Sequence, residues 1–123
     1  MRFKSLMLVV TALSFSTLVG CKSKCESNCD AMQDSDCDDA DHDGCLHLCI
    51  QQEDMEEDTD KCTSDWDALQ DCMADQDDIC KVLETETQDD GSVKFKKCNS
   101  EINDYADCYA DYCKDHDKRE YCK

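Results

Sequence analysis

Cysteine is the residue that most constrains this chain, because thirteen cysteines occur in only 123 residues. Twelve of them lie between Cys25 and Cys122, and the thirteenth is Cys21. An even set of cysteines at such density in a short chain is typical of a disulfide framework built in an oxidising compartment. The twelve can therefore pair with one another, and Cys21 requires a separate explanation.

The first twenty residues differ in kind from the rest of the chain. Arg2 and Lys4 form a short positive region, and residues 5–19, SLMLVVTALSFSTLV, carry no charge. This pattern is typical of a secretory signal peptide. The segment is shorter and richer in serine and threonine than a membrane span, which needs about 20 predominantly apolar residues. We therefore expect residues 1–20 to direct export.

The end of this segment, Leu18, Val19, Gly20 and Cys21, resembles the lipobox of bacterial lipoproteins. The resemblance implies cleavage before Cys21, acylation of its thiol, and attachment of the mature chain to the lipid bilayer of the cell envelope. In that family Lys22 after the lipidated cysteine favours the outer membrane. The alternatives are an ordinary secretory signal that ends near a cysteine and an uncleaved helix.

The composition of residues 21–123 leaves little for a hydrophobic core. Loss of Arg2 and Lys4 leaves eleven basic and thirty-one acidic residues, a net charge of −20, which argues against nucleic acid as a partner. Leu, Ile, Val and Phe number only ten here, a composition expected of a disordered chain. Because each disulfide adds about 2–4 kcal/mol, six of them can compensate.

The chain contains no proline, and helical periodicity dominates, so we expect an all-α fold of about four helices. Residues 22–33 and 43–58 form the first hairpin, 22–58. Stripes of apolar residues over 62–83 and 95–113 form the second hairpin, 61–122. Asp90 and Gly91 mark the turn between these stripes. Lys94, Lys96 and Lys97 are expected opposite Asp75, Asp77 and Asp78.

Facing residues in an antiparallel hairpin have position numbers with a constant sum, and this rule predicts four disulfides. The sum is 74 for Cys25 with Cys49 and for Cys29 with Cys45, and it is 170 for Cys62 with Cys108 and for Cys72 with Cys98. The sequence leaves four cysteines with no such constraint. Stacking of the two hairpins favours Cys37 with Cys80, which leaves Cys113 with Cys122.

The second hairpin resembles the twin C-x(9)-C proteins of the mitochondrial intermembrane space, through Cys62, Cys72, Cys98 and Cys108. That resemblance implies an antiparallel helix pair bridged twice. The first hairpin is similar to the α-hairpinin pattern of paired C-x(3)-C segments. Because a bacterial export signal conflicts with a mitochondrial address, we interpret the similarity as convergence. Neither resemblance implies an activity.

One arrangement of side chains suggests a ligand. Asp39, Asp41, Asp43 and Gly44 match positions 1, 3, 5 and 6 of a calcium loop, although Ile50 stands where a bidentate glutamate is required. The alternative is a solvated acidic loop. His47 between two cysteines suggests zinc, but bridged sulfur is no thiolate ligand.

No catalytic motif is present in the sequence, so we expect no enzyme. The function expected is that of a membrane-anchored, non-catalytic binding or structural module of the cell envelope, without a cofactor. Its protein partner cannot be named from the sequence. The second hypothesis is a weak extracellular calcium-binding protein that uses Asp39–Gly44.

Overall fold

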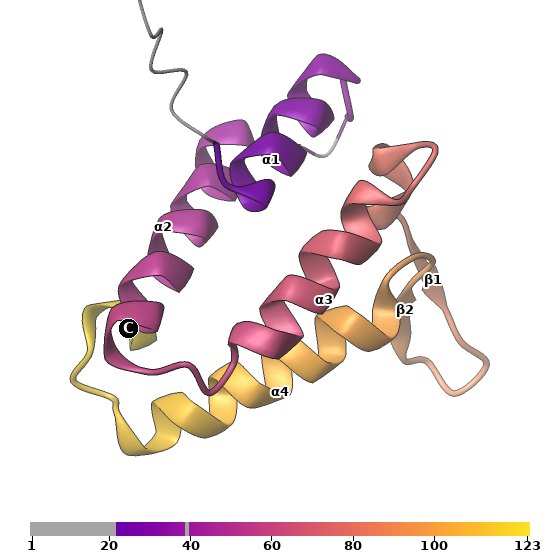
Figure 1. Ribbon diagram of the computed structural model, residues 1–123. Helices are drawn as coiled ribbons and strands as arrows, with labels where there is room; N and C mark the ends of the chain where they lie inside the picture. Colours follow the sequence, from indigo (N-terminus) through magenta and orange to yellow (C-terminus); the bar gives the residue numbers. More distant parts are fainter. Residues whose placement is uncertain (1–21, 39) are drawn as a thin grey trace, which may run out of the picture.

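The computed structural model describes residues 22–38 and 40–123, and in this part of the chain four α-helices carry most of the fold (Figure 1). Helices α1 (Lys24–Asp34) and α2 (His42–Asp58) pack side by side as the first hairpin. Helices α3 (Thr63–Ala74) and α4 (Asn99–Asp115) form the second. The all-α prediction of two antiparallel helical hairpins is confirmed.

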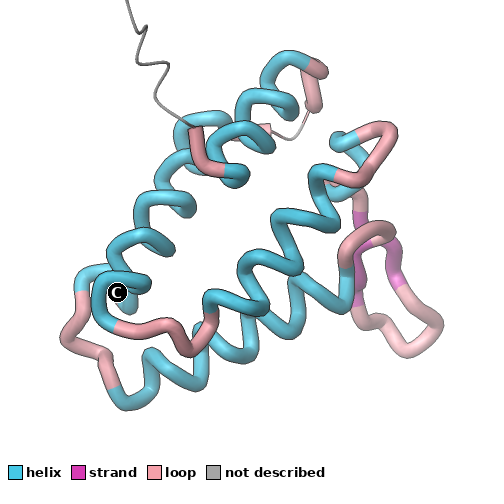
Figure 2. Tube along the Cα trace, viewed as in Figure 1, coloured by secondary structure: helices cyan, strands magenta, loops and turns pink. Residues whose placement is uncertain are grey.

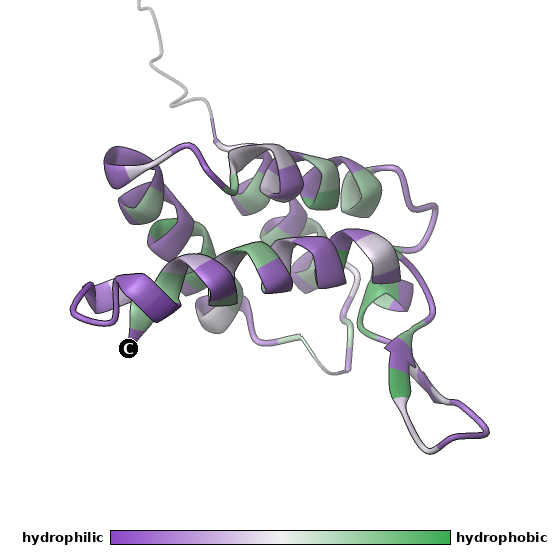
Figure 3. Ribbon diagram, turned by 90° about the horizontal axis from the view of Figure 1, so that it is seen from below, coloured by the Kyte–Doolittle hydropathy of each residue, from purple (hydrophilic) through white to green (hydrophobic). Residues whose placement is uncertain are grey.

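Local capping explains where the first helix begins. The Ser23 hydroxyl accepts a hydrogen bond from the Glu26 backbone N–H at 3.2 Å, which satisfies one of the donors that a helix start leaves free. Each helix carries interleaved hydrophobic and hydrophilic residues along its length, as Figure 3 shows. Such amphipathic helices bury one face only, so they require a partner helix.

The stripe predicted over 62–83 is not one continuous helix. Helix α3 ends at Ala74, and a separate 3-10 helix, η1 (Ile79–Val82), follows it. Asp75, Asp77 and Asp78 explain the break, because carboxylates are unfavourable at the negative end of a helix dipole. The Asp78 side chain instead accepts from the Cys80 N–H and caps η1.

A short antiparallel strand pair, which we did not predict from the sequence, precedes the fourth helix (Figure 2). Strands β1 (Thr85–Thr87) and β2 (Val93–Phe95) pair with Glu86 opposite Lys94. Gly91, with φ +84°, lies in the turn between them, where a left-handed conformation suits glycine. The fourth helix therefore begins at Asn99 rather than at Phe95.

The strand pair also corrects the expected charge contacts. Lys94 Nζ lies 3.1 Å from Glu86, and Lys96 Nζ lies 2.8 Å from Glu84. The lysines thus contact the glutamates of the same β-hairpin rather than Asp75, Asp77 and Asp78 of the preceding segment. The Lys96 ammonium lowers the pKa of Glu84 below its usual value. These pairs are exposed and contribute little to stability.

Six disulfides connect the fold, and their pairing is the one derived from the sequence. Four join facing helices within the hairpins: Cys25–Cys49, Cys29–Cys45, Cys62–Cys108 and Cys72–Cys98. Cys37–Cys80 links the end of the first hairpin to η1, and Cys113–Cys122 holds the terminal 3-10 helix η2 (Glu120–Cys122) against α4.

The buried core is small and rich in sulfur. Of the twelve buried apolar residues in the described part of the chain, five are bridged cysteines. The remaining ones form two clusters, one around Met32, Leu69 and Val82 and one around Met55 and Tyr112. Disulfides therefore occupy interior positions that aliphatic side chains fill in ordinary domains.

Polar side chains join the two hairpins across this interior. The Asn28 amide of α1 donates to the Gln70 backbone carbonyl of α3 at 3.1 Å and to its side-chain oxygen at 2.9 Å. Tyr121 donates to Asp58 at 2.6 Å, which connects η2 to the end of α2. Because these groups are buried or partly buried with their partners, each bond favours one packing of the hairpins.

Candidate functional site

An apolar groove of about 500 Å³ lies in the described part of the molecule. Its lining residues come from the first half of α2 and from α1, α3, η1, β2 and α4. Met32, Leu69 and Val82 form its buried part, and Met73, Phe95 and Ile102 are half-buried around them. This volume and lining are typical of a pocket for a small apolar ligand.

Leu48 marks the mouth of the groove. Its side chain is 57% exposed on α2, although it lines the groove. Ile50, two residues further along α2, is 54% exposed and lies outside the groove. Leu48 and Ile50 are therefore similar in size and in exposure on the same helix, but only Leu48 lines the groove.

The disulfide Cys29–Cys45 forms part of the groove wall. This bridge holds α1 and α2 with their Cα atoms 5.7 Å apart at that point. A second disulfide, Cys37–Cys80, holds η1, which contributes Val82, against the end of the first hairpin. Covalent links therefore fix α1 to α2 and η1 to the first hairpin, and all three of these elements contribute lining residues.

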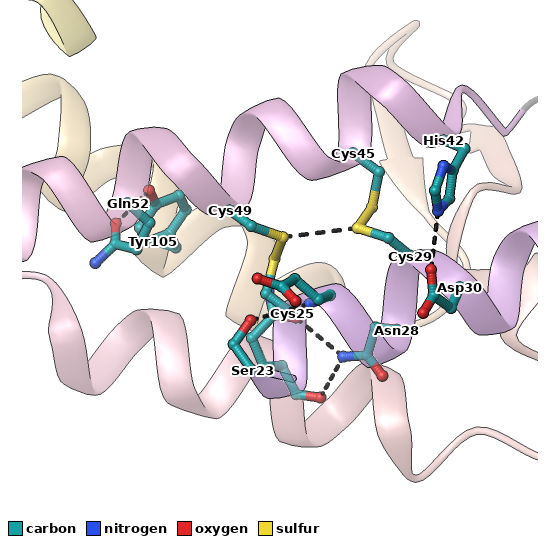
Figure 4. Close-up of a disulfide and its surroundings, with 12 residues drawn as sticks. Ser23, Cys25, Asn28, Cys29, Asp30, His42, Cys45, Cys49, Gln52 and Tyr105 are labelled. Carbon is teal, nitrogen blue, oxygen red and sulfur yellow. Dashed lines mark hydrogen bonds and ion pairs between the residues drawn. A yellow bond between two sulfur atoms is a disulfide. The ribbon is translucent and has the colours of Figure 1, made fainter. Parts of the chain in front are cut away.

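Two ionisable side chains line one end of the groove, Asp41 and His42. His42 Nε2 lies 2.9 Å from Asp30 Oδ1 of α1 (Figure 4). The Lys22 ammonium, and after it the contact with His42, lowers the pKa of Asp30 below its usual range. This end of the groove therefore presents a carboxylate and an imidazole that is oriented by a second carboxylate.

Gly44 permits the Asp41 carboxylate to lie over the start of α2. A Cβ atom at position 44 would come 2.6 Å from Asp41 Oδ2, closer than side chains approach one another. Asp41 precedes the first residue of the helix, where a negative charge interacts favourably with the helix dipole. Asp41 and Gly44, whose spacing suggested a calcium loop, thus form the start of α2.

The predicted calcium ligands lie partly outside the described residues, because Asp39 is one of those not described. Asp43 and Gly44 belong to the first turn of α2 rather than to a loop. The Asp43 side chain is fully exposed. The structure does not bring Asp43 together with Asp41 into a ligand set, and calcium binding at Asp39–Gly44 stays a prediction.

One group of three potential metal ligands with atoms within 4.8 Å of one another occurs among the described residues: Cys25, Cys29 and Cys49. All three are bridged, so they offer no thiolate in this state. His47, between two bridged cysteines on α2, is exposed. Cys21, the expected lipidation site, lies outside the described residues.

The groove is the feature that analysis of the sequence missed. Its lining comes from six separate elements. When each helix is considered alone, these apolar residues are indistinguishable from residues of a closed hydrophobic core. The only local signal was Leu48, an apolar residue that lies beside His47 in the sequence and is exposed on α2. That signal does not reveal which other elements approach it.

Comparisons with known proteins add no further assignment. A scan against protein-family models and searches of curated proteins and of solved structures found no match to this chain. In the described part of the chain, no helix is both long enough and apolar enough to cross a membrane.

Proposed function

We propose that this protein is a lipid-anchored, non-catalytic binding module of the bacterial cell envelope, and that its groove holds a small apolar molecule. The observation that carries the binding role is the groove of about 500 Å³, whose walls are mainly apolar and come from helices that disulfides fix in place. Burial of apolar ligand surface contributes about 25 cal/mol per Å² before the costs of association. A preformed groove lowers those costs because little has to be ordered on binding.

Charge indicates which ligands the groove favours. Asp41 is exposed at one end of the groove, and the chain as a whole carries a net charge of −18. A carboxylate or phosphate on the ligand would be repelled, whereas an amine would be attracted. We therefore assign the ligand class as an alkyl or ring compound with a neutral or positively charged polar end.

The anchor is proposed from the amino-terminal sequence. Cys21 follows a charge-free stretch and the Leu-Val-Gly triplet, and it is the thirteenth cysteine in a chain whose other twelve are bridged. Six bridges also suit an oxidising compartment outside the cytoplasm. Ser23, two residues after Cys21, caps the first helix, so the domain begins directly beside the bilayer.

Titration with three alkyl compounds of one chain length, an amine, an alcohol and a carboxylate, tests the binding role. The account predicts that the amine binds most tightly, the alcohol next and the carboxylate most weakly, as measured by calorimetry at low salt. High salt should reduce the difference between amine and carboxylate, because screening weakens the charge contribution. Equal binding of all three, or no binding, would contradict the ligand class.

A matched pair of variants separates the groove from the rest of the surface. Leu48→Asp places a carboxylate at the mouth of the groove and is expected to weaken binding of the alcohol at least tenfold. Ile50→Asp adds the same charge to the same helix outside the groove and is expected to leave binding unchanged. A similar effect of both substitutions would place the binding elsewhere.

Metabolic labelling with a radioactive fatty acid tests the anchor in a bacterial host. The unaltered precursor is expected to incorporate label and to sediment with membranes. Cys21→Ser, which removes the thiol that would be acylated, is expected to lose both properties. Label retained by Cys21→Ser would refute lipidation at this residue, and it would leave the groove experiment unaffected.

A further inference from the structure

The two bridges of the first hairpin lie against each other. Cys25–Cys49 and Cys29–Cys45 connect α1 and α2 on successive turns. The Cys29 Sγ atom lies 3.6 Å from the Cys49 Sγ atom, so a sulfur of one bridge contacts a sulfur of the other (Figure 4). Four sulfur atoms therefore form a continuous chain between the helices.

The four sulfur-bearing residues differ in their access to solvent. Cys45 is half-buried, whereas the exposed fraction is 6% for Cys25, 0% for Cys29 and 3% for Cys49. An external thiol attacks the disulfide sulfur that it can reach, and the other sulfur leaves as a thiolate. Attack in this cluster therefore occurs at Cys45, and the leaving thiolate is Cys29, the residue in contact with Cys49.

We propose that these four cysteines form a thiol–disulfide exchange relay across the interface of α1 and α2. An external thiolate bonds to Cys45 and breaks the Cys29–Cys45 bond, with its electron pair passing to Cys29. The Cys29 thiolate then bonds to Cys49 and breaks the Cys25–Cys49 bond, which leaves a thiolate on Cys25. That thiolate takes a proton from water, and a second external thiolate can attack the mixed disulfide at Cys45, which releases the Cys45 thiolate and forms an external disulfide.

The relay connects the two sides of the first hairpin. Cys29 and Cys45 line the apolar groove. Cys25 and Cys49 line a second, smaller cavity of about 190 Å³, next to Trp66 and Gln70 of α3. A thiol that enters through the groove therefore generates a new thiolate in the cavity on the other side, with no passage of the reductant between the helices.

Proximity offsets the low reactivity of a buried thiol. Burial raises the pKa of a cysteine thiol and lowers its thiolate fraction, which makes buried cysteines slow nucleophiles. Against this, a nucleophile held in good alignment with its target gains an effective concentration of about 10⁵–10⁸ M. The exchange also moves the helices, because Cys29 and Cys49 do not face each other and α1 must slide along α2 to join them.

Two variants that lose the same bridge test the relay in the full mature chain. Cys45→Ser leaves Cys29 as the free thiol, beside Cys49. The relay predicts that iodoacetamide alkylation followed by peptide mapping finds label on both Cys29 and Cys25, together with a Cys29–Cys49 bridge. Cys29→Ser leaves Cys45 free instead, and it should show label on Cys45 alone with Cys25–Cys49 intact.

Partial reduction of the unaltered protein provides the second measurement. With limiting dithiothreitol followed by rapid alkylation, label is expected on Cys25 together with Cys45 before the bridges of the second hairpin open. Label confined to Cys29 in Cys45→Ser, with Cys25 still bridged to Cys49, would overturn the relay. Equal release of thiols from all the bridges present, six in the unaltered protein and five in either variant, would also overturn it, because general unfolding would then explain the exchange.

Discussion

Tyr105 connects the two hairpins through one short hydrogen bond. Its hydroxyl donates to the Gln52 side-chain oxygen at 2.7 Å, and Gln52 is only 2% exposed (Figure 4). Burial is the main cause that raises the pKa of the Tyr105 hydroxyl well above its usual value. Burial therefore favours the protonated hydroxyl, the form that donates this hydrogen bond.

Tyr105→Phe should destabilise the fold by about 1–3 kcal/mol, because the Gln52 oxygen keeps its buried position and loses its donor. Urea unfolding of the oxidised protein measures this free energy. Tyr109→Phe is the matched control, since its ring lies 6.0 Å from that of Tyr105 and its hydroxyl has no hydrogen-bond partner within 22–38 and 40–123. Equal destabilisation by the two substitutions would contradict the role given to this bond.

Individual residues also show where inference from sequence succeeds. Eight of the twelve cysteines could be paired from helix spacing because a disulfide requires its two Cα atoms within a narrow range of distances, whereas the pairing of the other four depended on how the hairpins stack. Because of that condition, the spacing of cysteines along two antiparallel helices determines which cysteines can bond to each other. Asp41 and Gly44 show the opposite case, because the same spacing fits a calcium loop and the start of a helix, and only the backbone conformation distinguishes them.

At the scale of elements, two disulfides of similar exposure close loops of very different length. Cys37–Cys80 spans 43 residues and joins the hairpins, whereas Cys113–Cys122 spans 9 residues at the end of the chain. All four cysteines are half-buried, so replacement by serine removes similar packing in both cases. Comparison of the stability lost on removal of each of these two disulfides therefore measures the effect of loop length.

The double variant Cys37→Ser/Cys80→Ser should be less stable than Cys113→Ser/Cys122→Ser. If the loss of unfolded-state entropy dominates, the difference is roughly 1.4 kcal/mol, from the logarithm of the ratio of loop lengths. Urea unfolding of both double variants, followed by circular dichroism, gives the two free energies. A larger loss for the short loop would show that local contacts of η2 outweigh chain entropy.

Helices were easier to anticipate than the segment between them. Residues 22–33 and 43–58 became α1 and α2 with shifts of one or two residues, because cysteines four apart mark a helical face. The strands β1 and β2 were missed because three residues each carry too little alternation to stand out. The spacing of apolar residues led us to extend the third helix through 75–78. In the structure α3 ends at Ala74, because the three carboxylates that follow are unfavourable at the end of a helix.

At the scale of the whole molecule, the hairpin pairing could be predicted and the groove could not. Disulfide geometry relates residues pairwise, so two position sums were enough to define both hairpins. The groove depends on how α2, η1, β2 and α4 approach one another, and no pairwise rule in the sequence gives that arrangement. Leu69 and Ile102, for example, would be apolar whether they filled a closed core or lined an open groove.

The account depends on one property of the whole molecule, namely that bridged sulfur replaces the aliphatic core this chain lacks. Met32, Met55, Leu69, Ile79 and Val82 are the only buried aliphatic or thioether side chains among the described residues. By area alone, so few side chains cannot offset the entropy of ordering about a hundred residues.

Circular dichroism of the mature domain before and after full reduction and alkylation tests this claim most directly. The account predicts that the oxidised protein melts cooperatively, and that the reduced and alkylated protein loses most of its helical signal and has no cooperative transition. A reduced and alkylated chain that keeps its helical signal and melts cooperatively would contradict it.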